Sequence, residues 1–327
     1  MLTARPLDPR RCDVYSPDEG TMAMSNHGVP AEEGAPGFPA LPEGKRVGVL
    51  MIHGGAWMLG EKEQLEMWAR GMAKKGYVCV LNGYRLALPP DQRTAISLAN
   101  GMDDAGGVSE DNWAAEFGQW PTMIHDCKAA GEHAARHGRL QASIPTGFLT
   151  PACVAVRWMR ASADELGISA EHIAVTGNSA GGHLSLLVAG VDGELYPELE
   201  GEGGNPGVSS KVQACCAVYP PTTTRAPPFV QAPGSNERDA ASFTPFQYAS
   251  EHFPPTCFIH GNGDTLVPQA ESFKMYDELL SRGAHAEMHV GAATTASAGS
   301  VSGRQCPDSD RERWLADVRQ HATRLRL

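Results

Sequence analysis

Residues 175–183 of the chain read VTGNSAGGH, a stretch in which one serine is framed by glycines. Residues 177–181 fit the pattern G-x-S-x-G, with the apolar β-type run 172–176 before them and the helix-compatible run 180–188 after them. Glycines two residues before and after Ser179 relieve crowding in a sharp strand-to-helix turn, which would expose the serine hydroxyl on a strained backbone. The stretch therefore predicts a nucleophile elbow. The alternative is a glycine-rich turn capped by a serine.

Apolar runs of strand length recur along the chain, at 47–52, 77–82, 212–219, 256–260 and 286–290. Segments with helical apolar spacing lie among them, at 61–75, 154–166, 269–281 and 311–324. A strand that is followed by a helix and then a strand favours a parallel sheet with the helices packed on it. The order of elements predicts the α/β class, with a mostly parallel central sheet and helices on both faces.

The chain is expected to form one main domain. Residues 1–44 are rich in Pro, Gly and Glu, and we interpret them as an edge strand at 13–17 followed by a loose loop. Residues 45–327 would form the α/β domain, with an irregular polar insert at 131–151 and a proline-rich, cap-like segment at 220–248.

Charge and hydrophobicity argue against a protein that binds nucleic acid or a membrane. The 327 residues carry a formal net charge of -11, so no basic patch is expected to bind nucleic acid or an anionic membrane. No apolar run approaches the ~18 residues of a membrane span, and no secretory signal is recognised, so we expect a cytoplasmic protein.

The eight cysteines contain no C-x-x-C pair, which favours reduced thiols over disulfides or zinc. No metal-ligand cluster is visible, so neither a metal nor a cofactor is expected, and a metal-dependent hydrolase has little support.

An acid for a serine nucleophile is suggested by residues 260–268, which read HGNGDTLVP. They place Asp264 in a loop just beyond the strand expected at 256–260. A local alternative is that Asp264 caps the following helix. The order of serine before aspartate along the chain favours a catalytic acid.

Donors for an oxyanion are suggested by residues 53–57, HGGAW, at the end of the first core strand. Two glycines allow backbone N–H groups to approach a ligand closely. With the N–H of Ala180, Gly54 and Gly55 would form the donor set. A simple β-to-α turn, the alternative, would not require the flanking histidine and tryptophan.

Several motifs together resemble the esterase/lipase group of the α/β-hydrolases. They are HGGAW (53–57), YR (84–85), DCKAA (126–130), VRW (156–158), GNSAGGH (177–183) and HGNGDTLVP (260–268). The chain looks most like the small carboxylesterases and feruloyl-esterase-like proteins with an HGG-x-W motif, a group to which kynurenine formamidases are also similar. The resemblance covers roughly residues 45–325. It implies the α/β-hydrolase fold and a small-molecule ester substrate.

The same resemblance implies roles for single residues. Ser179 would be the nucleophile, Asp264 the triad acid, and Gly54, Gly55 and Ala180 the oxyanion region. The histidine of the family's triad follows the last strand, but residues 291–300 contain none.

The histidines after Asp264 are His285, His289 and His321. His289, one residue before the expected end of its strand, is the candidate base. The alternative is a buried or edge-strand histidine without that role.

The insert at 131–151 separates two pieces that resemble halves of one family helix. It is either a lineage-specific loop or translated non-coding sequence, and a mis-assembled gene would also account for the missing histidine in 291–303. Sequencing the transcript would separate these explanations.

Three functions stay open at this level. The first is hydrolysis of carboxylic esters through an acyl-enzyme on Ser179. The second is an arylformamidase, because the HGG-x-W signature is shared. The third is a non-catalytic protein of the same fold that binds a small ligand, which the missing histidine favours. The sequence does not indicate an oligomeric state.

Overall fold

The computed structural model describes residues 13–17, 41–57, 60–84, 154–191, 196, 205, 207–223 and 244–291. Its strands are β1 (Asp13–Tyr15), β2 (Arg46–Ile52), β3 (Val78–Asn82), β4 (Ile168–Asn178), β5 (Ala214–Val218), β6 (Thr256–Gly261) and β7 (Ala286–Gly291). Its helices are η1 (Lys62–Leu65), α1 (Glu66–Ala73), α4 (Val154–Ala161), α5 (Ala163–Leu166), α6 (Ala180–Gly190), η4 (Pro245–Tyr248) and α9 (Ala270–Ser281), of which η1 and η4 are 3-10 helices.

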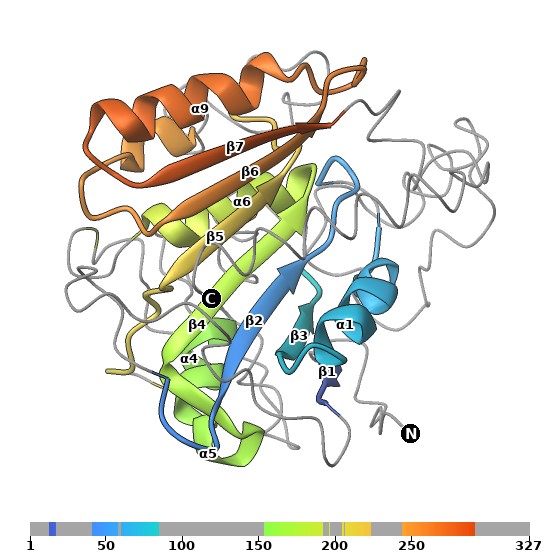
Figure 1. Cartoon of the computed structure of the whole chain (residues 1–327), viewed down its shortest axis with the longest axis vertical. Helices are drawn as coiled ribbons and strands as arrows, with labels where there is room; N and C mark the ends of the chain where they lie inside the picture. The colour runs from blue at the N-terminus through green and yellow to red at the C-terminus, as the bar shows by residue number, and fades with distance from the viewer. Residues whose placement is uncertain are drawn as a thin grey trace, which may run out of the picture.

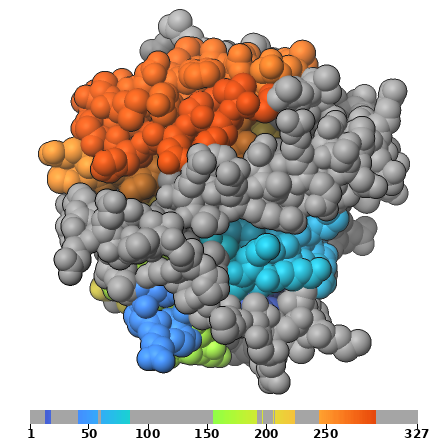
Figure 2. Space-filling model, in the orientation of Figure 1, coloured from blue at the N-terminus to red at the C-terminus, as the bar shows by residue number. Residues whose placement is uncertain are grey.

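The described strands form one sheet in the order β1-β3-β2-β4-β5-β6-β7. β1 pairs antiparallel with β3, and the other neighbours pair parallel. The expected mostly parallel α/β sheet is therefore confirmed, and β1 lies at one edge of it. Figure 1 shows the twisted sheet with α1 beside the β1–β3 end and α9 beside β6 and β7. In the same view, α9 and β7 form a continuous part of the surface (Figure 2).

Alternate side chains of β2 enter different parts of the core, as the two-residue period of a strand requires. Leu50 and Ile52 pack in the large cluster with residues of α4, α6 and α9. Val49 and Met51 pack instead with residues of α1. Helices therefore cover both faces of the sheet, as the sequence predicted.

Some elements differ in extent from the expectation. The helix expected at 154–166 is divided into α4 and α5 around Ser162. β4 begins earlier than the run at 172–176, because Ile168 already pairs with Arg46. In the part of the chain described here, no helix is long and apolar enough to cross a membrane.

Some expected segments lie outside the described residues. They are the insert at 131–151, the middle of the cap-like segment at 224–243 and the helix at 311–324. At the far end of the cap-like segment, η4 brings Tyr248 against Gly190, the last residue of α6. A cap stays a prediction.

Glycines allow α6 to start directly against β2. A Cβ atom built on Gly181 would lie 2.0 Å from the carbonyl oxygen of Ile52 and 2.5 Å from that of His53. A Cβ on Gly177 would lie 2.5 Å from the same Ile52 oxygen. These distances are far below any real carbon–oxygen contact, so the glycines are required by packing.

Gly181→Ala should lower the free energy of unfolding by at least about 3 kcal/mol or prevent folding, because a backbone carbonyl must move to admit the methyl group. Gly71 in α1 is the matched control, since a Cβ there meets nothing within 4 Å. Gly71→Ala should be neutral or stabilising by up to about 1 kcal/mol, because alanine favours a helix. Urea unfolding followed by circular dichroism measures both, and equal stabilities of the two variants would contradict the packing account.

Candidate active site

Ser179 stands alone between β4 and α6 in a strained backbone conformation. Its φ of 54° and ψ of -121° lie where side chains other than glycine are rarely found. Its N–H donates to the carbonyl of Val218 at 2.9 Å, and its own carbonyl accepts the N–H of His183 at 3.0 Å. The half-buried serine therefore occupies the strand-to-helix turn that the sequence predicted.

The HGGAW loop lies against this turn. A Cβ on Gly54 would be 2.9 Å from Asn178 Nδ2 and 3.3 Å from Ser179 Cβ, so the loop backbone touches the elbow. Gly55, Ala56 and Trp57 all have positive φ, at 119°, 51° and 61°. Strained residues often gather at functional sites, and here they gather at the carboxyl ends of neighbouring strands.

Ala180 is the first residue of α6, so its N–H is one of those without an acceptor inside the helix. The fold thus brings Gly54, of the predicted oxyanion set, close to Ser179 and places Ala180 next to it in the chain. Gly55 follows in the same loop. The start of α6 adds a positive dipole end at this point.

Buried aromatic rings support the HGGAW loop. His53 Nδ1 lies 2.7 Å from the carbonyl oxygen of Gly54, and the His53 ring stacks on Tyr84 with centroids 4.3 Å apart. The Tyr84 hydroxyl donates to the carbonyl of His53 at 3.1 Å. On the other side, Trp57 meets His183 edge to face at 5.2 Å. The loop is therefore held from the chain just after β3 and from α6.

Asp264 follows β6, and its side chain is only 2% exposed. Its Oδ1 accepts the N–H groups of Leu266 and Val267, both at 2.9 Å. α9 begins after Gln269, so Asp264 closes its own turn and does not cap the helix. Oδ1 is thus engaged, and Oδ2 lies 3.7 Å from His260 Nε2, which is too far for a hydrogen bond.

His260 is a supporting residue that the sequence did not reveal. Its Nε2 lies 2.7 Å from the carbonyl oxygen of Val267, and its Nδ1 lies 2.7 Å from Ser272 Oγ. A carbonyl only accepts, so Nε2 carries the proton and Nδ1 accepts from the serine hydroxyl. Burial lowers the pKa of His260 and keeps the ring neutral. The ring thereby connects the Asp264 turn to α9. In the sequence, only the position of His260 near the end of a predicted strand could have indicated this supporting role.

His289 lies in β7, with its Nε2 3.3 Å from Glu287 Oε2. The strand registers put it in one row with Ile259, Val218 and Asn178. Three strand spacings separate β7 from β4, which is about 14 Å. In parallel strands such a row shares one face, so Ile259 and Val218 stand between His289 and the elbow. Its role as the base stays a prediction.

Metal binding has no evident site, since no three His, Cys, Asp or Glu side chains group suitably in the described part of the chain.

The burial of His53 generates a prediction about pH. Burial lowers its pKa from 6.5 to about 4, although the bond to Gly54 raises it in part. Between these values the unfolded chain binds a proton that the folded chain does not, so stability falls as the pH is lowered through this window. Across this whole pH window, His53 should lower the free energy of unfolding by about 3 kcal/mol.

Urea unfolding at pH 7 and at pH 4.5 measures this effect in the wild type and in His53→Asn. The variant should have a distinctly smaller difference between the two pH values. His260, whose pKa is also lowered, should keep part of the difference in both proteins. An unchanged difference in His53→Asn would contradict the assignment.

The chain is similar to known proteins in sequence and in fold. Residues 149–279 match the family model BD-FAE. Esterase LipC of Mycobacterium tuberculosis is 26% identical over 256 residues, covering 72% of this chain and 49% of the relative. The probable carboxylic ester hydrolase LipM of the same organism is 25% identical over 248 residues, covering 71% and 44%. The chain thus spans about half the length of the curated relatives it matches.

Solved structures show the same fold. Thermogutta terrifontis esterase 2 phosphorylated by paraoxon superposes with a TM-score of 0.62 at 18% identity, covering 99% of this chain and 94% of that one. A truncated form of carbohydrate esterase from gut microbiota gives 0.59 at 17% identity, covering 96% and 92%. The fold and these matches together confirm the resemblance of the chain to the esterase group of the α/β-hydrolases.

Proposed function

We propose that the chain is a serine hydrolase that cleaves carboxylic esters through an acyl-enzyme on Ser179. The observation that carries this proposal is the strained Ser179, held at the start of α6 with the Gly54 backbone against it. Similarity to proteins named as esterases supports the choice of substrate class.

The nucleophile, the oxyanion donors and the acid each have a candidate residue in this chain. Ser179 Oγ attacks the carbonyl carbon of the ester, and its proton passes to a base. The carbonyl oxygen becomes an oxyanion, which N–H groups of Gly54, Gly55 and Ala180 would stabilise. The base returns the proton to the departing alcohol, and water then releases the acid from Ser179. Asp264 would orient the base through Oδ2 and stabilise its protonated form.

Fluorophosphonate labelling and hydrolysis of short p-nitrophenyl esters test the proposal. The wild type should label and turn over, and Ser179→Ala should lose labelling and turnover, the latter by about 10⁶-fold. Asp264→Asn should lose about 10⁴-fold, because the base is then held in the wrong tautomer. Folded wild type that neither labels nor hydrolyses would contradict the proposal and favour a ligand-binding protein.

His289 is tested separately as the base. If His289 is the base and contacts Ser179, its replacement by alanine should lower turnover by about 10⁶-fold. Given the row of side chains between His289 and the elbow, we expect His289→Ala to lose less than about tenfold. A loss near the full factor would show that β7 approaches the elbow during the reaction. His285→Ala, one residue before the start of β7, is the control.

An arylformamidase is the second candidate, because the HGGAW loop that it would share lies at the elbow. The nucleophile and the oxyanion donors would be the same, and the bond cleaved would be an aryl formamide. N-formylkynurenine and p-nitrophenyl acetate, compared by kcat/KM, separate the two. A higher value for the formamide would replace the ester hypothesis.

A further inference from the structure

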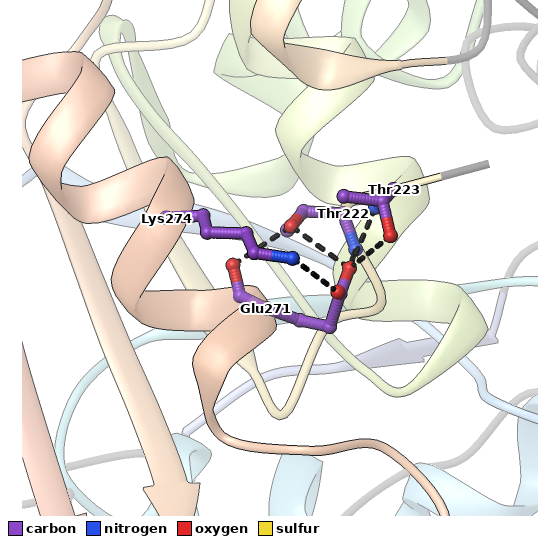
Figure 3. Close-up of polar contacts among 4 residues, drawn as sticks. All are labelled: Thr222, Thr223, Glu271 and Lys274. Atoms are coloured by element: carbon purple, nitrogen blue, oxygen red, sulfur yellow. Dashed lines mark hydrogen bonds and ion pairs between the residues drawn. The ribbon is translucent and has the colours of Figure 1, made fainter. Parts of the chain in front are cut away.

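A buried carboxylate joins α9 to the chain that leaves β5. Glu271, in the first turn of α9, is 9% exposed. Its Oε2 accepts the N–H of Thr222 at 3.0 Å, the N–H of Thr223 at 2.7 Å and the hydroxyl of Thr223 at 2.8 Å. The Thr222 hydroxyl donates to the main-chain oxygen of Glu271 at 2.7 Å. Figure 3 shows both threonines gathered at this carboxylate.

The donors keep this carboxylate ionised. Burial alone would raise the pKa of Glu271, but the hydrogen bonds from Thr223 and Thr222 lower it overall. Lys274 adds a weaker contribution, with its Nζ 3.3 Å from Oε1. Hydrogen bonds to a charged acceptor are stronger than neutral ones, so the two threonines are firmly held.

The other end of the same segment touches the nucleophile elbow. The carbonyl of Val218, the last residue of β5, accepts the N–H of Ser179. Tyr219 follows with a φ of 36°, and its hydroxyl accepts a hydrogen bond from Asn178 Nδ2 at 3.0 Å. Burial raises the pKa of the Tyr219 phenol, so this hydroxyl stays protonated.

These contacts form one path through space. Asn178 and Ser179 hold residues 218 and 219, and Glu271 holds residues 222 and 223 of the same short segment. Pro220 and Pro221 connect the two ends and restrict the backbone between them. A displacement of Thr222 should therefore displace Tyr219 as well.

We propose that Glu271 is a positioning residue for the nucleophile elbow, acting through residues 218–223. It contacts the chain leaving β5 and, by this proposal, no substrate. This inference rests on the function proposed for Ser179. The competing explanation is that Glu271 only docks α9 and affects stability alone.

Four variants separate these explanations. Glu271→Ala removes the acceptor, and Glu271→Gln keeps one oxygen for the threonine donors. Lys274→Ala is the matched control on the same helix, since the 55% exposed lysine reaches only the other oxygen. Leu279→Ala opens a cavity in the buried distal half of α9 and controls for lost stability.

The measurements are kcat and KM for p-nitrophenyl acetate, the rate of fluorophosphonate labelling, the melting temperature, and hydrogen exchange of peptides covering 177–183. Glu271→Ala should lower kcat and the labelling rate by about 10 to 100-fold, with KM changed by less than about threefold. Glu271→Gln and Lys274→Ala should stay within about threefold of the wild type. Leu279→Ala should lower the melting temperature and leave kcat within the same range at a temperature where it is folded.

An unchanged kcat in Glu271→Ala, or an equal loss in Leu279→Ala, would overturn the positioning role. A wild type without turnover or labelling would instead overturn the proposed function. In that case hydrogen exchange still tests the positioning role of Glu271. Faster exchange of residues 177–183 in Glu271→Ala than in Lys274→Ala supports it, and equal exchange in the two variants overturns it.

Discussion

Contact between two backbones is the constraint on which the site depends. The carbonyl end of β2 touches the start of α6 so closely that Gly177 and Gly181 admit no side chain. The register confirms this approach, since Ile52 pairs with Gly177. Because β2 ends there, the HGGAW loop must emerge beside Ser179. One packing contact therefore sets both the position of Ser179 and the position of the HGGAW backbone beside it.

Strain at this edge is balanced by fixed hydrogen bonds. Ser179 and Tyr219 both have positive φ, and each donates its N–H to a carbonyl of the next strand, at Val218 and Ile259 respectively. Buried histidines hold the flanking loops: His53 supports the HGGAW loop and His260 supports the Asp264 turn. These bonds fix the two loops, and the proposed function would need such preorganised groups, since electrostatic stabilisation in enzymes comes from donors that are already in place.

Local sequence patterns predicted much of the fold, but they did not predict the contacts between residues that are far apart in the sequence. The apolar runs and the glycines around Ser179 predicted the parallel sheet and the elbow, because both depend on neighbours in sequence. The Glu271–Thr222 contact spans 49 residues, and it depends on a register that no local pattern encodes. The break at Ser162 was missed for a related reason, since apolar spacing continues across it. The base was harder to predict, because residues 291–300, where the esterase/lipase group has its histidine, contain none. His289 was the candidate instead, and its role stays a prediction.

A trapped acyl-enzyme would test the central claim, that Ser179 is a working nucleophile, most directly. The wild type is mixed with p-nitrophenyl acetate, quenched in acid within the first turnovers, and digested for mass spectrometry. We predict an acetyl group on the peptide that contains Ser179, absent from Ser179→Ala. Release of p-nitrophenol with that peptide unmodified, or with the acetyl group on another residue, would contradict the account.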